Sequence, residues 1–468
     1  MIALTVAEIV EITGGSLAPG QESRAEQVVS GSVETDSRLV QPGSVFVALR
    51  GEVTDGRLFV GSAVERGAAL VVAEAPVDVD VPVVVVDDGV TALSRLAAAV
   101  VERVRRRGAL RVVGVTGSNG KTSTKNMLRA VLGDVAATVA PQGSFNNHVG
   151  APISMLRIDD DTEYLVVEMG ASGPGEIARL VEIARPDTGV VLKVGLAHAG
   201  GFGGIEGTRA AKSEMVTDLP ETGTAILNAD DDRVAGMASV TAARVVTFGL
   251  SSSADYRASD VDVTAEGTSF TFDHGDLTRR VSLRILGEHH VMNALAALAV
   301  AGEWGLDLDR AATVLEGVAR AERWRMEVLD GGDGVTVVND AYNASPDSVA
   351  AALKTLVQIV PEGGRSIAVL GEMAELGDAA REEHDRVGRL VVRLNVSQLV
   401  VVGHAARHIS TAAGLEGSWD GESVLVDDVD AAYELLREQL RPGDVVLVKS
   451  SKSAGLRFLG DRLAGVTE

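Results

Sequence analysis

The stretch Gly117–Ser123, G-S-N-G-K-T-S, combines residue types that bind phosphate. Glycines let backbone N–H groups approach phosphate oxygens closely. Lys121 is placed to reach β- and γ-phosphates, and the hydroxyl of Thr122 or Ser123 is placed to coordinate Mg²⁺. These features predict ATP binding by the loop residues Gly117, Ser118, Asn119, Gly120, Lys121, Thr122 and Ser123.

The elements on either side of this loop would direct it toward a ligand. The β-branched run Val112–Val115 is typical of a buried parallel strand. The residues from Lys121 onward, KTSTKNMLRAVL, are typical of a helix, whose N-terminus adds partial positive charge. The spacing is shorter than in the usual G-x-x-x-x-G-K-[ST] loop, because position 115 is valine. The alternative is therefore a plain glycine turn before an amphipathic helix.

Glu168 ends a second apolar run, Tyr164–Glu168, which predicts another buried strand. A carboxylate at the C-terminal end of a parallel strand, downstream of a phosphate loop, is suited to bind Mg²⁺. The alternative is that Glu168 merely caps the helix that begins near Gly175.

Two pairs of polar residues could contact a substrate. Ser37 and Arg38 offer a hydroxyl and a forked cation, which suit a phosphate or a uracil carbonyl. Taken alone, they are more typical of a solvated loop before a Pro-Gly turn. Asn146 and Asn147 lie in the Gly/Pro/Asn-rich loop 140–150 and supply adjacent amide donors.

Two further positions carry little information by themselves. His198 follows a predicted strand and is, alone, typical of a surface or core histidine. Lys212 lies in the next predicted helix and is, alone, typical of a solvated lysine.

His289 and Asn293 open an alanine-rich helix and share a face at i,i+4 spacing.

Composition limits the classes of function. The chain has 468 residues and a formal net charge of −23, which disfavours nucleic acid or an anionic membrane as a partner. It has no cysteine, which excludes disulfides and thiolate chemistry. The N-terminus lacks the basic segment of a signal peptide, and the longest apolar run, Val291–Gly302, is too short to span a membrane. We therefore expect a cytoplasmic protein.

The length predicts about three domains at about 150 residues each. Strands alternate with helices along the chain, and each strand delivers polar residues at its C-terminal end, which is typical of doubly wound α/β domains. We expect an α/β protein with a small N-terminal domain (1–86), a central P-loop-type ATP-binding domain (87–319) and a C-terminal Rossmann-like domain (320–468). Residues Arg244–Leu286 alternate polar and apolar side chains, which predicts an antiparallel extension of the central sheet.

Together these stretches resemble the Mur ligase family, ATP-dependent enzymes that form amide bonds in bacterial cell-wall precursors. The resemblance covers nearly the whole chain and rests on T-G-[ST]-x-G-K-T at Thr116–Thr122, on the strand-end Glu168 and on G-x-H-x-x-x-N-A-x-A-A at Gly287–Ala297. It implies that His289 and Asn293 bind the adenine side of ATP. It also identifies Arg325 as the arginine that approaches ATP from the C-terminal domain.

The resemblance also implies a metal centre. The family's Ala-His matches Ala197-His198, and its CO₂-carbamylated lysine matches Lys212 in A-A-K-S-E. The implied catalytic residues are Lys121, Glu168, His198 and Lys212. Two Mg²⁺ ions are implied, held by Thr122, Glu168, His198 and the carbamate of Lys212.

Within the family, D-A-Y-N-A-S-P at Asp340–Pro346 and V-L-G-E-M-A-E-L-G-D at Val369–Asp378 resemble the dipeptide-adding subgroup. This implies that D-alanyl-D-alanine is joined to UDP-N-acetylmuramoyl-tripeptide through an acyl phosphate, for peptidoglycan synthesis. Asp340 and Asn343 would then swing toward ATP on domain closure. T-D-S-R at Thr35–Arg38 resembles the family's uridine-nucleotide site, which implies that Ser37 and Arg38 bind there.

This sequence departs from the subgroup's pattern at two positions. Arg57 stands where the subgroup usually has histidine, and Lys193 where asparagine is common. The alternatives are another ligase of the superfamily, such as a folylpolyglutamate-type enzyme, or a P-loop NTPase that is not a ligase. We expect a monomer.

Overall fold

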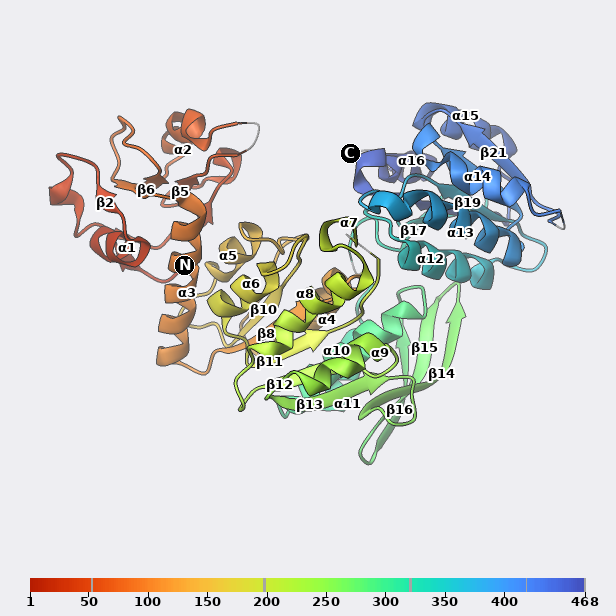
Figure 1. The fold of residues 1–468 in the computed structure, drawn as a ribbon, viewed down its shortest axis with the longest axis horizontal. Coiled ribbons are helices and arrows are strands. Elements are labelled where there is room, and N and C mark those ends of the chain that lie inside the picture. The colour runs from red at the N-terminus through yellow and green to blue at the C-terminus, as the bar shows by residue number, and fades with distance from the viewer. Residues whose placement is uncertain (52–53, 197–198, 320–321, 418, 467–468) are drawn as a thin grey trace.

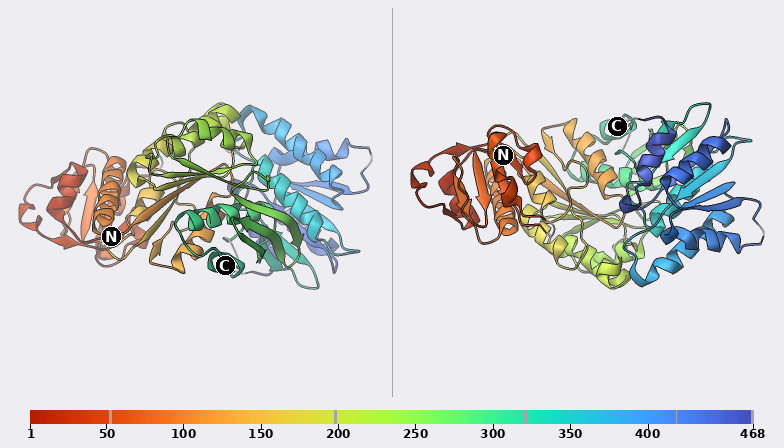
Figure 2. Two further views of the ribbon diagram at one scale, coloured as in Figure 1. Left: turned by 90° about the horizontal axis from the view of Figure 1, so that it is seen from below. Right: turned by 90° about the horizontal axis from the view of Figure 1, so that it is seen from above.

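The computed structural model describes residues 1–51, 54–196, 199–319, 322–417 and 419–466. Its sheets lie in a row along the long axis, with the N-terminal part at one end and the C-terminal part at the other (Figures 1 and 2). Parallel strand pairs dominate each of the main sheets, which confirms the predicted α/β class. Within the described residues, no helix is long and apolar enough to cross a bilayer.

The N-terminal part contains a sheet of order β2-β7-β6-β5-β4, in which only β2 runs antiparallel to its neighbour. Its strands are β2 (Ser16–Leu17), β4 (Val33–Glu34), β5 (Val45–Ala48), β6 (Leu70–Ala73) and β7 (Val83–Val85). A separate antiparallel pair joins β1 (Leu4–Thr5) to β3 (Val28–Val29). The helices are α1 (Val6–Thr13) and α2 (Val60–Glu65), with 3₁₀ turns η1 (Glu22–Arg24), η2 (Ser37–Leu39) and η3 (Gly56–Phe59).

Local sequence explains where α1 begins and ends. Thr5 accepts a hydrogen bond from the Glu8 N–H, while Glu8 accepts one from the Thr5 N–H, which is a reciprocal N-terminal cap. Gly14 then ends the helix in the left-handed region at φ 72°, where a side chain would be strained.

Helix α3 (Gly89–Arg107) joins the N-terminal part to the central part. It packs against α1 on one side and against α5 and α6 on the other (Figure 1). Its buried Leu93 and Leu96 belong to one apolar cluster with Ile9 of α1 and Ile177 of α6. The two parts therefore share a hydrophobic core rather than meeting only through a linker.

The central sheet has the order β16-β15-β14-β13-β12-β11-β8-β10-β9. Its strands are β8 (Arg111–Thr116), β9 (Thr138–Val139), β10 (Tyr164–Glu168), β11 (Thr188–Val191), β12 (Thr224–Asn228), β13 (Arg244–Gly249), β14 (Tyr256–Thr264), β15 (Gly267–His274) and β16 (Leu277–Leu283). The predicted antiparallel extension is present from β14 to β16. The expectation was wrong for β13, which is still parallel to β12.

Strand β8 is the point at which the order of the central sheet reverses. The chain fills one side of β8 with β9 and β10 and then crosses to β11 on the other side. Ligands of open α/β sheets bind at such a switch point, beyond the carboxyl ends of the strands. The loop Gly117–Gly120 lies directly at this point.

Helices cover both faces of the central sheet (Figures 1 and 2). They are α4 (Lys121–Gly133), α5 (Gly150–Met155), α6 (Glu176–Ala184), α7 (Ala199–Phe202), α8 (Ile205–Thr217), α9 (Asp232–Ala235), α10 (His289–Glu303) and α11 (Leu308–Glu316), with the 3₁₀ turn η4 (Gly236–Ser239). The alanine-rich α10 lies beside α4 and is buried along nearly its whole length. Small side chains allow this close packing, which brings the start of α10 next to the phosphate loop.

The C-terminal sheet has the order β17-β18-β22-β19-β20-β21, parallel except for β17. Its strands are β17 (Glu327–Asp330), β18 (Thr336–Asn339), β19 (Ser366–Leu370), β20 (Gln398–Val402), β21 (Glu422–Val426) and β22 (Val445–Lys449). Its helices are α12 (Pro346–Ile359), α13 (Ala380–Arg393), α14 (Arg407–Gly414), α15 (Val429–Gln439) and α16 (Leu456–Leu463), with η5 (Gly377–Ala379), η6 (His404–Ala406) and η7 (Lys452–Ala454).

Candidate active site

A cavity of about 1040 Å³ lies between the central and C-terminal parts. Its lining contains most of the residues predicted to bind ATP or metal, namely Ser118, Asn119, Gly120, Lys121, Thr122, Ser123, Asn146, Glu168, His289, Asn293, Arg325, Asp340 and Asn343. Ser37, Arg38, Gly117, Asn147 and Lys212 are not part of this lining, and His198 lies outside the described residues. The volume and polarity suit a nucleoside triphosphate together with the reacting end of a second substrate.

The predicted strand and helix are present as β8 and α4, and they border the predicted phosphate loop, residues 117–120. Gly120 immediately precedes α4 and has φ 85°, a conformation that favours glycine. A Cβ at Gly120 would also collide with the side-chain oxygen of Asn293. The loop is held from the other side by Ser118, whose hydroxyl accepts from the Gly195 N–H at 2.8 Å and donates to the Gly195 carbonyl at 3.1 Å.

Lys121 folds back over its own loop. Its Nζ donates to the Gly117 carbonyl at 2.7 Å. Burial lowers the pKa of Lys121, and the neighbouring Glu168 carboxylate opposes that shift. An anion bound at the loop would stabilise the charged ammonium in the same way.

Glu168 and Thr122 contact each other at the cavity wall. Glu168 Oε1 accepts from the Thr122 hydroxyl at 3.2 Å and from the Asn146 amide at 2.8 Å. Glu168 Oε2 is buried and has no hydrogen-bond partner among the described residues. A buried, unpaired carboxylate oxygen is costly unless a ligand binds it.

This donor set fits Mg²⁺, which proteins bind through one or two carboxylates together with substrate phosphates and water. Within the described ranges, no group of three or more His, Cys, Asp or Glu side chains could hold a metal ion alone.

Lys212 is buried in α8, with 2% of its surface exposed. Within the described part of the chain its ammonium makes no hydrogen bond or ion pair, and its nearest ring is Phe202, whose centroid lies 5.7 Å from Nζ. Burial, and then repulsion from Lys121, lowers the pKa of Lys212 to about 7. A large fraction of this amine is thus neutral at physiological pH, which is the form that reacts with CO₂.

The start of α10 presents two histidines to the cavity. His289 Nδ1 and His290 Nε2 are buried without hydrogen-bond partners among the described residues. Burial lowers the pKa of His289 to about 4 and that of His290 well below its ordinary value, so both rings are neutral near pH 7. Asn293 Nδ2 lies 3.3 Å from His290 Nδ1, and its Oδ1 accepts from Thr124.

Arg325 reaches the phosphate loop from the C-terminal part. Its Nη2 donates to Thr122 Oγ1 at 3.3 Å, and its guanidinium lies 4.3 Å from the Tyr342 ring centroid. Tyr342 in turn hydrogen-bonds the Ser144 hydroxyl of the loop 140–150. A cation is thus fixed next to the position where the phosphates of ATP would lie.

Lys449 holds the segment that contains Asp340 and Asn343. Its Nζ contacts Asp340 Oδ2 at 2.6 Å and donates to the Asn343 carbonyl at 3.0 Å. Asp340 Oδ1 also accepts from the Met326 N–H at 3.0 Å. The Asp340 carboxylate is therefore already oriented at the cavity wall.

Sequence reasoning missed several residues of the cavity wall: His290, Ser144, Tyr342, Ser345, Asp347 and Lys449. Lys449 is the last residue of the valine-rich strand β22, so the strand-end rule that selected Glu168 could also have found it. The capping pattern Ser345-Pro346 marks the start of α12, but nothing in the sequence indicates that Ser345 donates to Asn119 at 3.1 Å.

Ser37 and Arg38, the first predicted substrate-binding pair, differ in exposure. Arg38 is paired with Asp36, but 82% of its side chain is exposed, while Ser37 is buried. Arg57 makes the same kind of pair with Asp55. These residues belong to the N-terminal part and not to the cavity.

Asn146 and Asn147 also separate. Asn146 contacts Glu168, whereas Asn147 Oδ1 accepts from the Val149 and Gly150 N–H groups at the start of α5. Only Asn146 of the two contacts the Glu168 carboxylate.

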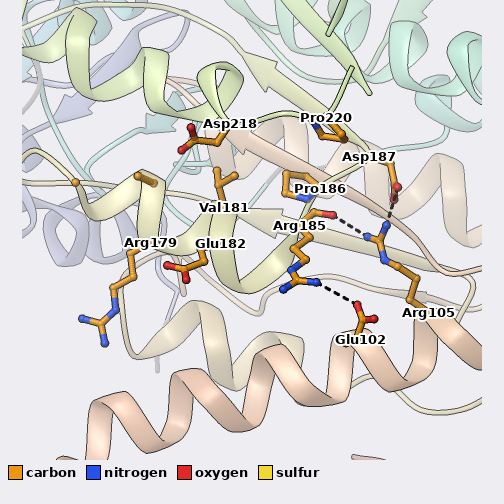
Figure 3. Close-up of a pocket in the computed structure, with 12 residues that line it drawn as sticks. Glu102, Arg105, Arg179, Val181, Glu182, Arg185, Pro186, Asp187, Asp218 and Pro220 are labelled. Carbon is orange, nitrogen blue, oxygen red and sulfur yellow. Dashed lines mark hydrogen bonds and ion pairs between the residues drawn. The ribbon is translucent and has the colours of Figure 1, made fainter. Parts of the chain in front are cut away.

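A second hollow, of about 800 Å³, lies between α3 and α6 on the outside of the central part (Figure 3). Arg105 donates to Asp187 at 2.7 Å and to the Arg185 carbonyl at 2.8 Å, and Arg185 lies 3.5 Å from Glu102 (Figure 3). These contacts pair Arg105 with Asp187 and Arg185 with Glu102 across the hollow.

Three family models match the chain in succession. They are described as Mur ligase family, catalytic domain (residues 31–113), Mur ligase middle domain (115–301) and Mur ligase, glutamate ligase domain (324–452). A relative in Mycobacterium tuberculosis, named UDP-N-acetylmuramoyl-tripeptide--D-alanyl-D-alanine ligase, is 46% identical over 99% of this chain and 98% of its own. This chain belongs to the Mur ligase family. The membership predicted from the motifs is confirmed.

Solved Mur ligase structures match the fold over its whole length. A crystal structure of MurF from Acinetobacter baumannii superposes with a TM-score of 0.89 at 29% identity, covering 99% of each chain. A structure of MurF ligase from Thermotoga maritima in complex with ADP superposes with a TM-score of 0.81 at 29% identity, covering 93% of this chain and 98% of that one.

Proposed function

We propose that this Mur ligase joins D-alanyl-D-alanine to UDP-N-acetylmuramoyl-tripeptide, with conversion of ATP to ADP and phosphate. The observation that carries the proposal is the near full-length, 46% identical relative that is named for this reaction. The product would be the UDP-muramoyl-pentapeptide used in peptidoglycan synthesis. Asp340 and Asn343 of the subgroup's D-A-Y-N stretch support the same conclusion, because they line the cavity opposite the phosphate loop.

The reaction needs positive charge at the point where two anions meet. An oxygen of the tripeptide carboxylate attacks the γ-phosphorus, the bond to the β–γ bridging oxygen breaks, and ADP leaves. Like charges in contact repel strongly at the dielectric of a partly buried site. Lys121 and Arg325 supply fixed cations there, and the first N–H groups of α4 add partial charge.

The second step forms the amide. The neutral dipeptide amine attacks the acyl carbon, the carbon–oxygen bond to phosphate breaks, and the amine loses a proton. No protein nucleophile is required, so the residues act by positioning and by electrostatic stabilisation. The Ser345–Asn119 contact brings the C-terminal part, where the dipeptide would bind, against the phosphate loop.

Mg²⁺ fits the site as the group that neutralises phosphate oxygens during the transfer. We propose that Thr122 and Glu168 hold one ion, and that His198 and a carbamylated Lys212 hold a second. The unpaired Oε2 of Glu168 supports the first assignment. The buried Lys212, with its lowered pKa, supports the second, because carbamylation replaces an unpaired cation with a carboxylate.

We propose a role for each part of the chain. Residues 1–86 would bind the UDP-muramoyl substrate, with Ser37 and Arg38 at the uridine nucleotide. Residues 87–319 would bind ATP, with His289 and Asn293 on the adenine side, and residues 320–468 would bind the dipeptide. We expect a cytoplasmic monomer that contributes to cell-wall growth and division, and light scattering on the purified protein tests the monomer.

One assay tests the proposed function. The protein is mixed with UDP-N-acetylmuramoyl-tripeptide, D-alanyl-D-alanine and ATP, and phosphate and the pentapeptide product are measured. Release of phosphate that requires both substrates supports the proposal. Release with folate and glutamate instead would favour a folylpolyglutamate-type ligase, and release with neither would favour a simple NTPase.

A further inference from the structure

Lys125 is a buried lysine that the proposed reaction does not use. It lies one turn after Lys121 on α4, with 1% of its surface exposed. Its Nζ donates to the Pro141 and Gly143 carbonyls, each at 3.0 Å, and lies 3.9 Å from Glu322 Oε2. The three donors of the ammonium thus face two backbone carbonyls and one carboxylate.

A buried lysine at position 125 lowers the stability of the fold more than an apolar side chain of the same size would. Burial of an ammonium carries a desolvation penalty, and an apolar side chain of similar length would fill the same space without it. Lys125 is therefore better explained by the groups that it binds than by the volume that it occupies. Both carbonyls belong to the loop 140–150, which has no regular structure between β9 and α5.

The residues that follow these carbonyls reach into the active site at two points. Asn146 donates to Glu168 Oε1 at 2.8 Å, and the Asn146 carbonyl accepts from the Gly170 N–H at 2.8 Å. Ser144 hydrogen-bonds the hydroxyl of Tyr342, whose ring packs against Arg325. The loop therefore touches a metal donor of the central part and the cation contributed by the C-terminal part.

We propose that Lys125 is a positioning residue that fixes the segment 141–146 so that Asn146 orients Glu168 and Ser144 holds Tyr342 against Arg325. The consequence for catalysis rests on the proposed function. Within the described residues, no hydrogen bond joins this segment directly to residues 117–121, so loss of Lys125 should reduce turnover of the peptide substrate far more than nucleotide binding. Lys125 is not itself a catalytic residue, since it contacts only protein groups.

The structural claim has a test that needs no substrate. Phe145 lies within the segment and is 39% exposed, while Phe59 and Phe458, each 42% exposed, lie in the other two parts of the chain. Chymotryptic cleavage after Phe145 is compared with cleavage after Phe59 and Phe458 in the full-length protein. The variant Lys125→Met should raise the Phe145 rate by at least about fivefold, because two carbonyls lose their donor, and leave the other two rates unchanged.

The matched control is Arg129→Met, one turn further along α4, where the side chain is exposed and lies outside the cavity. It should leave all three cleavage rates and the activity unchanged. Equal acceleration at all three bonds in Lys125→Met would mean general destabilisation and would overturn the proposal. An unchanged rate at Phe145 would overturn it as well.

Kinetics separate positioning from catalysis. In Lys125→Met, kcat/KM for the UDP-tripeptide should fall by at least about tenfold, while the Kd for ADP changes less than about twofold.

If Lys125→Met does not fold, the cleavage test is made with Lys125→Arg, because this variant keeps the charge next to Glu322 but not the ammonium geometry. Selective cleavage after Phe145 in that variant supports the proposal, and unselective cleavage or none overturns it. Failure of the ligase reaction in wild-type protein would affect only the kinetic part.

Discussion

Lys193 Nζ lies 3.6 Å from Asp347 Oδ1, and this ion pair joins the end of the central sheet to the first turn of α12. Next to it, Ser345 donates to Asn119 of the phosphate loop. Two contacts between the central and C-terminal parts thus lie side by side in the wall of the cavity. Lys193 is the residue that departs from the asparagine common in the subgroup, and the structure gives its charge a partner.

Reversal of one charge should weaken this contact. Lys193→Asp places two carboxylates together, and we expect a fall in kcat/KM for ATP of about threefold, since partly exposed pairs contribute modestly. The double variant Lys193→Asp/Asp347→Lys should recover at least half of the loss. Initial rates in low salt measure the effect. A double variant no better than the single one would show that the pair does not contribute to closure.

Lys121→Ala should remove turnover while leaving the fold intact. The side chain is only partly buried and its charge, rather than its volume, is the important property, so we expect phosphate release to fall at least about 100-fold with little change in Tm. Phosphate release and thermal unfolding monitored by circular dichroism measure the two effects. Near wild-type release from the folded variant would rule out the phosphate-loop assignment.

Arg38→Ala tests the proposed uridine site. Removal of an exposed forked cation should raise the KM for the UDP-substrate about tenfold and leave the KM for ATP unchanged. Arg24→Ala is the control, because Arg24 makes a comparable ion pair, with Asp80, in the same part of the chain. Equal increases in both KM values would mean that this segment is not a separate uridine site.

Lys212→Ala should be nearly inactive and should recover partly with short carboxylic acids in solution. The acid would fill the position of the proposed carbamate, whereas a lysine that acts only as a cation would be replaced by an amine. Rates are measured across a series of acetate and methylamine concentrations. Full activity of the variant, or recovery with methylamine alone, would contradict carbamylation.

The buried His289 should make stability depend on pH. Its pKa is lowered to about 4, so between that value and the ordinary 6.5 the unfolded chain binds a proton that the native chain does not. Stability is therefore fully present above about pH 6.5 and decreases as the pH falls to 4, by at most about 3 kcal/mol from this group.

Urea unfolding at a series of pH values measures this effect. His289→Asn should flatten the dependence between pH 6.5 and 4, whereas His148→Asn, at an exposed position, should not. An unchanged slope in His289→Asn would show that the pKa of His289 is not lowered in the folded protein.

The sequence alone was sufficient for the features that are contiguous in the chain. G-S-N-G-K-T between a valine-rich run and a helix predicted a phosphate loop, and the strand and helix on either side of it are confirmed, because each is determined by neighbouring residues. Glu168 was found in the same way, as a carboxylate at the end of an apolar strand. These short stretches, together with D-A-Y-N-A-S-P, were enough to predict the family and the α/β class.

Only the tertiary structure decided which distant groups meet. Arg325 and Thr122 are more than 200 positions apart yet lie 3.3 Å from each other, and Lys125 is directed at two carbonyls that no side-chain pattern marks. Periodicity shows which face of an element is buried but not which element covers it. The parallel pairing of β13, the burial of His290 and the separation of Asn146 from Asn147 all depend on that packing, because it is set by contacts between elements rather than by local preference.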